Sequence, residues 1–216
     1  NNFLGHENTI PVTLDELISL SRAVVKGSEK ALVIADLPFG SYEASLQIAL
    51  ESSIRLLKEA GVAGVKLEGG VRVCEQVKAL VSSGIPVMGH LGMTPQSVNA
   101  FGGFKVQGRD SKADEIIKDA LALQEAGAFA IVLELIPAKL ATELSKRLSI
   151  PTIGIGAGIN CDGQVLVWTD LMGLTPKPPR FSRAYLNLRQ DMVAAVGRWI
   201  SDVESGSFPS DKESFD

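Results

Sequence analysis

A lysine and a glutamate stand two residues apart in the apolar run GVKLEGG, at residues 64–70. If this run is a β-strand, side chains two residues apart point to the same face, so Lys66 and Glu68 lie together. Charges buried on a sheet face cost free energy unless they are paired or bind a ligand. The two residues could therefore form a structural ion pair, or belong to a site for a metal ion or an anion at the strand end.

Three other apolar runs also end on a residue that could do chemistry. Asp36 ends ALVIAD, His90 ends PVMGH and Glu134 ends AIVLE. Taken alone, Asp36 could cap a turn and His90 could be a hydrogen-bonded histidine of the core. A carboxylate such as Glu134 at the end of so apolar a run is harder to explain structurally. Together, two or three carboxylates with a lysine and a histidine suit a hard cation such as Mg²⁺ and an anionic, oxygen-rich substrate.

The elements that must position these residues alternate along the chain. Apolar strands that alternate with helices indicate a parallel sheet covered by helices, which leaves a doubly wound sheet or a (βα)8 TIM barrel. Polar residues or glycines end every strand, and no single phosphate-binding loop dominates. This α/β pattern favours the barrel, with about six βα units present. We expect strands within residues 31–38, 63–70, 85–92, 129–137, 150–158 and 164–170, and helices near 13–26, 43–60, 71–82, 112–126, 138–148 and 184–204, the first with Thr13 as its N-cap.

The composition limits the class of protein. The 216 residues are 45% hydrophobic, enough to bury the core of a single domain, 1–216, that ends in a polar tail at 205–216. The net charge of −4 and the lack of a basic run argue against nucleic-acid binding. Cys74 and Cys161 are far apart, which argues against a disulfide framework or thiolate zinc site and fits the cytoplasm. No apolar stretch is long enough to predict a membrane span.

Two glycine-rich segments have functional interpretations. GIGAG, at residues 154–158, is a weak match to a dinucleotide fingerprint, because no GxGxxG run opens a helix there. In a barrel, its small residues would leave room for a ligand. NAFGGFKVQGRD, at residues 99–110, is long enough to act as a lid over the site, or it could be a loop without a role.

Longer stretches of the sequence resemble the ketopantoate hydroxymethyltransferase family, in the family's order and over nearly the whole chain. GHLGMTPQSVNAFGGFKVQGR, at residues 89–109, is very specific to that family. The other matching stretches are GHENTIPVT, ADLPFGSY, VKLEGG, LELIPAKLA, IPTIGIGAG, CDGQVLVWTD and VESGSFPSDKESF.

The resemblance implies a fold and an activity. The family fold is a (βα)8 barrel. Enzymes of the family are usually decamers, so the resemblance implies a homo-oligomer. Its enzymes transfer a hydroxymethyl group from methylene-tetrahydrofolate to 2-oxoisovalerate through a Mg²⁺-stabilised enolate, which gives ketopantoate for pantothenate biosynthesis. The implied partners are therefore a 2-oxo acid, a folate and Mg²⁺, with no nucleic acid or membrane.

The resemblance also implies a role for each candidate residue. Glu134 matches the proposed proton acceptor of the family. Asp36 matches an aspartate that binds both metal and substrate, and Glu68 matches a glutamate linked to the metal. Lys66 matches the lysine that contacts the keto acid, and His90 matches a histidine of the same site.

The sequence departs from the family at its front. The family has about two βα units before the GH-[DE]-x-T motif, and the second ends in a GDS motif that supplies a metal-binding aspartate and a substrate-binding serine. Neither unit precedes GHENT at residues 5–9, so we expect the N-terminal two βα units to be missing from the barrel. The alternatives are a related Mg²⁺-dependent 2-oxo acid aldolase or lyase that needs no folate, and an inactive barrel fragment.

Overall fold

The computed structural model describes residues 4–215. Residues 1–3, in the expected opening loop, and Asp216, in the expected C-terminal tail, lie outside the described residues. The chain divides into two compact units, Asn1–Val165 and Leu166–Asp216. The first unit carries the sheet and all the candidate site residues.

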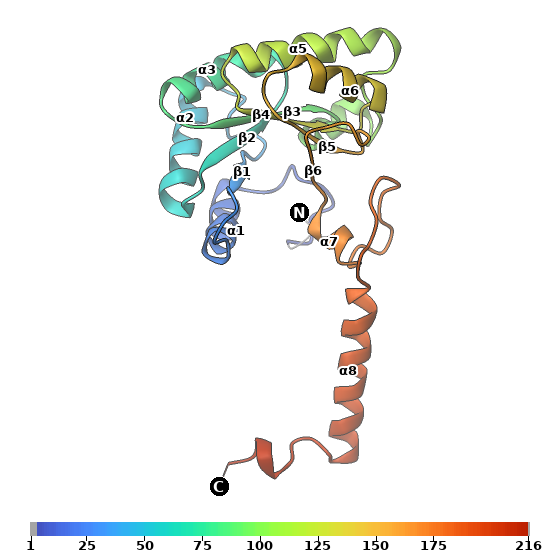
Figure 1. Ribbon diagram of the computed structural model, residues 1–216. Coiled ribbons are helices and arrows are strands. Elements are labelled where there is room, and N and C mark those ends of the chain that lie inside the picture. The colour runs from blue at the N-terminus through green and yellow to red at the C-terminus, as the bar shows by residue number, and fades with distance from the viewer. Residues whose placement is uncertain (1–3, 216) are drawn as a thin grey trace. The chain divides into compact units, whose positions relative to one another are not determined.

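The first unit is built on a parallel sheet in which each strand pairs with the next one along the chain (Figure 1). A doubly wound sheet reverses its strand order at a switch point, whereas sequential order is the order of a (βα)8 barrel wall. Within the described residues the sheet has six strands that form a half-barrel, which confirms the expected fold class. The strands are β1 (Ile34–Asp36), β2 (Gly64–Glu68), β3 (Val87–Gly92), β4 (Ala130–Glu134), β5 (Thr152–Ile155) and β6 (Gly163–Gln164).

Helices connect the strands, close to the predicted ranges. The first begins at the predicted N-cap, where the Thr13 hydroxyl accepts a hydrogen bond from the Glu16 N–H and the Glu16 carboxylate accepts one from the Thr13 N–H. The helices of this unit are α1 (Leu14–Gly27), α2 (Leu46–Arg55), α3 (Cys74–Ser82), α4 (Val98–Phe101), α5 (Ala113–Glu125) and α6 (Ala138–Arg147), with a π-helical turn at Leu56–Ala60 and 3-10 turns at Val71–Val73, Pro95–Ser97 and Asp110–Lys112.

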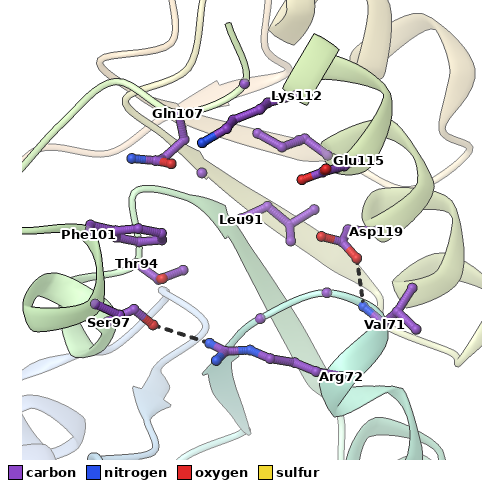
Figure 2. A pocket seen from close by; sticks show the side chains of 16 residues that line it. Val71, Arg72, Leu91, Thr94, Ser97, Phe101, Gln107, Lys112, Glu115 and Asp119 are labelled. Atoms are coloured by element: carbon purple, nitrogen blue, oxygen red, sulfur yellow. Dashed lines mark hydrogen bonds between the residues drawn. The ribbon is translucent and has the colours of Figure 1, made fainter.

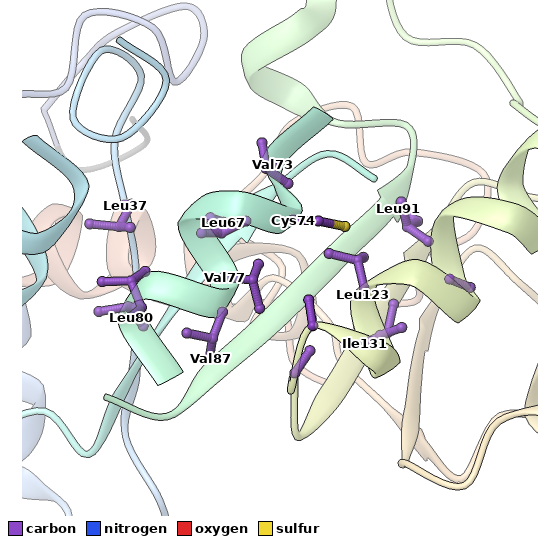
Figure 3. Close-up of a cluster of buried hydrophobic side chains, with 14 of the residues drawn as sticks. Leu37, Leu67, Val73, Cys74, Val77, Leu80, Val87, Leu91, Leu123 and Ile131 are labelled. Atoms are coloured by element: carbon purple, nitrogen blue, oxygen red, sulfur yellow. The ribbon is translucent and has the colours of Figure 1, made fainter. Parts of the chain in front are cut away.

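The two faces of the sheet differ in character. Leu67, Leu91 and Ile131 point toward α3 and α5, where they pack with Val77 and Leu123 in the buried core (Figure 3). Side chains alternate between the faces of a strand, so the residues beside these three point to the opposite face. That opposite face is the interior of the half-barrel, and it carries the candidate site residues.

The last predicted strand is wrong for most of its length. Within residues 164–170, only Gln164 belongs to a strand, and Trp168–Leu171 form the short helix α7. The Leu171 N–H donates to the Val167 carbonyl, a helical hydrogen bond rather than a sheet bond. Periodicity cannot distinguish so short an apolar run from a helical turn.

The second unit contains α7 and the longer helix α8 (Leu188–Ser205), followed by a 3-10 turn at Asp211–Glu213. Several large apolar side chains of α8, including Val196 and Trp199, are exposed within the described residues. None of the helices in residues 4–215 combines the length and apolar character needed to cross a membrane.

Both cysteines are free thiols. Cys74 is buried at the start of α3, and Cys161 is half-buried just before β6. Burial raises the pKa of both thiols above the ordinary value. Little thiolate therefore forms at neutral pH, which disfavours a nucleophilic role for either residue.

Candidate active site

Five predicted residues form one continuous chain of contacts at the carboxyl ends of β1 to β4. Lys66 Nζ lies 3.0 Å from Asp36 Oδ2 and 3.2 Å from His90 Nδ1. His90 Nδ1 is 3.7 Å from Glu68 Oε1, and His90 Nε2 is 3.3 Å from Glu134 Oε2. We call these five residues the rim cluster.

Strand register explains why the rim cluster converges. Asp36 pairs with Lys66 across β1 and β2, and Glu68 pairs with His90 across β2 and β3. Paired residues of neighbouring parallel strands point to the same face, so these side chains all enter the half-barrel. Glu134 pairs with Gly92, two residues beyond His90, and reaches the same face from β4.

The contact with Lys66 favours one tautomer of His90. An ammonium group can only donate hydrogen bonds, so this contact favours Nδ1 as the acceptor and a ring proton on Nε2, facing Glu134. Nε2 is nevertheless buried and has no hydrogen-bond partner among the described residues, because the contact with Glu134 is not aligned as a hydrogen bond. A buried donor left unpartnered is typical of a site that receives a ligand.

Two carboxylates each keep one oxygen that accepts no hydrogen bond from a described residue. Glu68 Oε2 accepts the Gln96 N–H at 3.0 Å, and Asp36 Oδ2 contacts Lys66, whereas no hydrogen bond from a described residue reaches the second oxygen of either. Mg²⁺ is often held by one or two carboxylates plus water and substrate oxygens, so this donor set fits Mg²⁺. Within residues 4–215, no group of three or more His, Cys, Asp or Glu residues is placed to hold a metal.

Two glycines let the backbone pass close to the rim cluster. A Cβ at Gly70 would lie 1.9 Å from Asp119 Cγ on α5, and the Asp119 carboxylate accepts the Val71 N–H at 2.8 Å. A Cβ at Gly92 would lie 2.1 Å from the Glu134 carbonyl oxygen, and Gly92 has a φ of +93°. GVKLEGG thus ends on Gly70 because Asp119 of α5 leaves no space there for a side chain, and on Gly69 because that residue has a φ of +127°, which favours glycine.

The residue after Glu134 has an uncommon backbone conformation. Leu135 has a φ of +48°, in the left-handed region that non-glycine residues rarely adopt. Its N–H donates to the Ile155 carbonyl, and its carbonyl accepts the Gln107 N–H, both at 2.9 Å. These bonds hold the turn after Glu134 between β5 and the glycine-rich segment, and such local strain clusters at functional sites.

A cavity of about 430 Å³ lies beside the rim cluster, on the side of the strand ends that faces α5 (Figure 2). Leu91 and Asp119 line it, and Arg72 closes one side through a hydrogen bond to Ser97. No residue of the rim cluster lines this cavity. Part of its wall comes from the predicted lid, including Ala100, Phe101, Gln107 and Gly108.

Two residues that contact Glu68 were not predicted from the sequence. Tyr42 is almost fully buried, and its hydroxyl accepts the Glu68 N–H at 3.2 Å. Gln96 donates its own N–H to the Glu68 carboxylate. Neither residue ends an apolar run, so no spacing pattern could have singled it out.

A model of the family described as ketopantoate hydroxymethyltransferase matches residues 1–211. This chain belongs to the ketopantoate hydroxymethyltransferase family. It is 56% identical to a 3-methyl-2-oxobutanoate hydroxymethyltransferase of Acidothermus cellulolyticus, over all of this chain and 80% of that protein. It is 52% identical to the enzyme of the same name from Mycobacterium ulcerans, over all of this chain and 73% of that protein.

One solved structure resembles this member of the ketopantoate hydroxymethyltransferase family in fold. A putative lyase/mutase from Burkholderia cenocepacia matches with a TM-score of 0.50 at 18% identity. The match covers 92% of this chain and 69% of that one.

Proposed function

We propose that the protein transfers a hydroxymethyl group from methylene-tetrahydrofolate to 2-oxoisovalerate, which yields ketopantoate. The observation that carries this proposal is the convergence of Asp36, Lys66, Glu68, His90 and Glu134 on one face of the half-barrel. Relatives at 52–56% identity carry the name 3-methyl-2-oxobutanoate hydroxymethyltransferase, which supports it.

Glu134 acts as the base. Its carboxylate removes the C3 proton of the keto acid, which leaves a carbon nucleophile for the one-carbon unit of the folate. Glu134 ends β4 and lies next to the strained turn at Leu135, so its position is fixed by the sheet. His90 presents its Nε2 proton to the same region, where it can donate to a substrate oxygen.

Lys66 binds the anionic substrate. Its ammonium group is in contact with both Asp36 and His90, so it lies at the centre of the rim cluster. Its ammonium group can donate charge-assisted hydrogen bonds to the substrate carboxylate. Water supplies the hydroxyl oxygen of the product, and tetrahydrofolate leaves.

Mg²⁺ would be held by Asp36 and Glu68. When bound, it supplies a Lewis acid that draws electron density from the keto group and favours loss of the C3 proton. We further propose that residues 99–110 close over the site, because long glycine-rich segments of this kind often act as lids. From the family resemblance we also propose that the protein forms a homo-oligomer (a decamer in the family), and we propose that it works in the cytoplasm.

Two assays on the same protein test this function. Proton exchange at C3 of 2-oxoisovalerate in D2O, followed by NMR, should occur with Mg²⁺ and without folate. Ketopantoate should form only when methylene-tetrahydrofolate is also present. Condensation of 2-oxoisovalerate with an added aldehyde in the absence of folate would instead support the aldolase or lyase alternative. Absence of both exchange and product would contradict the proposal and support an inactive fragment.

A further inference from the structure

Two hydrogen bonds of Gln96 join three separate strand ends. Its backbone N–H donates to Glu68 Oε2 at 3.0 Å, at the end of β2. Its side-chain amide donates to the Leu37 carbonyl at 2.7 Å, one residue after Asp36 at the end of β1. Gln96 itself lies in the 3-10 turn that follows β3. One residue therefore ties both proposed metal ligands to the segment that leads into the predicted lid.

Tyr42 forms hydrogen bonds with both Glu68 and Gln96. Its hydroxyl oxygen accepts the Glu68 N–H at 3.2 Å, and its own proton has a near acceptor in Gln96 Oε1 at 2.8 Å. The Glu68 carbonyl is a second possible acceptor, but it is more distant at 3.2 Å. Only 1% of Tyr42 is exposed, so solvent cannot replace these partners.

The partners determine how the Gln96 amide is oriented. The Leu37 carbonyl can only accept, so it requires the NH2 group of Gln96. The Tyr42 hydroxyl already accepts from Glu68, so it donates to the amide oxygen. Both requirements are met by one orientation, and a carboxylate in place of the amide would leave the Leu37 carbonyl without a donor.

We infer that Gln96 and Tyr42 are positioning residues for the metal site, an inference that rests on the proposed function. They hold Glu68 Oε2 and the end of β1, so that Glu68 Oε1 and Asp36 stay turned toward the interior of the half-barrel. Neither side chain contacts Lys66, His90 or Glu134 through a hydrogen bond among the described residues. Their loss should therefore weaken metal binding without removing the base.

The direct test measures metal affinity without substrate. Mn²⁺ binding to the purified protein is followed by electron paramagnetic resonance, with Mn²⁺ as a paramagnetic substitute for Mg²⁺. Gln96→Met, Gln96→Glu and Tyr42→Phe should each weaken binding by about 10-fold, the low end of the effect of removing a group that orients a metal ligand, because the Gln96 backbone N–H that bonds Glu68 Oε2 stays in every variant. Gln76→Met is the matched control, because Gln76 donates to the Tyr42 carbonyl at 3.4 Å but does not reach Glu68; it should bind Mn²⁺ normally.

Proton exchange at C3 provides the second measurement. Saturating Mg²⁺ should restore the exchange rate of Gln96→Met and Tyr42→Phe to near that of the unaltered protein, because Glu134, Lys66 and His90 are intact. Circular dichroism and thermal unfolding show that each variant is folded. A folded variant whose exchange rate stays low at saturating Mg²⁺ would point to a general structural role and overturn the inference.

Glu68→Gln separates this inference from the proposed function. If Glu68→Gln loses Mn²⁺ affinity but Gln96→Met and Tyr42→Phe do not, the positioning role is wrong and the proposed function stands. If Glu68→Gln retains full affinity, both the positioning role and the assignment of Glu68 to the metal are overturned.

Discussion

The two ends of the sheet carry polar groups that are arranged in opposite ways. At the carboxyl ends lies the rim cluster, in which His90 Nε2 has no hydrogen-bond partner among the described residues. At the amino end of β5, Asp162 accepts hydrogen bonds from the Thr152 N–H at 2.8 Å and the Thr152 hydroxyl at 2.9 Å. The Ser145 hydroxyl lies 2.6 Å from that same hydroxyl. We call Asp162, Thr152 and Ser145 the base cluster, after its place at the amino end of the sheet.

The difference between the clusters separates folding from function. In the base cluster the only carboxylate, Asp162, has its pKa lowered by the hydrogen bonds from Thr152, and the buried Thr152 has partners for its polar atoms. Such a satisfied group stabilises the local structure and offers nothing to a ligand. The rim cluster keeps donors and acceptors unpaired, so a ligand can complete it. Substitutions in the two clusters should therefore have different consequences.

The largest effect should come from removing the proposed catalytic base, Glu134, which belongs to the rim cluster. Glu134→Gln keeps the size of the side chain but cannot accept a proton, so C3 exchange of 2-oxoisovalerate should fall by about 10²- to 10⁴-fold. Substrate binding, measured by calorimetry, should change little, and so should thermal unfolding. Full exchange in this variant would remove Glu134 as the base.

A smaller effect is expected from the proposed metal ligand in β1. Asp36→Ala should raise the Mg²⁺ concentration needed for half-maximal exchange on the order of 10- to 100-fold, because one of two carboxylates is lost. The same titration on Asp162→Ala, in the base cluster, is the control and should give an unchanged midpoint. Turnover that survives exhaustive chelation would contradict the metal requirement.

The base cluster should show the reverse behaviour. Thr152→Val removes the hydroxyl shared by Ser145 and Asp162, so the free energy of unfolding should fall by about 1–3 kcal/mol. Urea unfolding measures this loss, while the exchange rate of the folded variant should stay within twofold. Thr142→Val, on the accessible face of α6, should cost less. If Thr152→Val lost as much activity as stability, the proposed difference between the base cluster and the rim cluster would be contradicted.

The smallest effect concerns pH. Burial, and then the charges of Glu43 and Glu68, raise the pKa of Tyr42 above its ordinary value of about 10. Above that pH the unfolded chain loses the proton while the folded protein keeps it, so stability falls as pH rises, by up to about 1.4 kcal/mol per pH unit. Denaturant titrations at pH 8 to 11 should show a flatter alkaline decline for Tyr42→Phe. Identical pH slopes in both proteins would contradict this.

Much of the first unit could be predicted from the sequence, for a physical reason. Parallel strands bring their carboxyl ends to one edge, so polar residues that end apolar runs must meet there, as Asp36, Glu68 and Glu134 do. The roles of Tyr42 and Gln96 could not be predicted, because they depend on hydrogen bonds between residues 26 to 59 positions apart. The run at 164–170 was misjudged because apolar content does not specify whether a segment pairs with a sheet.

The two free thiols described earlier can report on local opening of the structure. Cys74 is buried against the outer core, whereas Cys161 is half-buried near the base cluster, and both have raised pKa values. Modification of Cys74 by a thiol reagent under native conditions should therefore wait for its region to open, whereas Cys161 should react sooner. The modification rate of Cys74 would then report how often α3 leaves the sheet, with Cys161 as the faster internal reference.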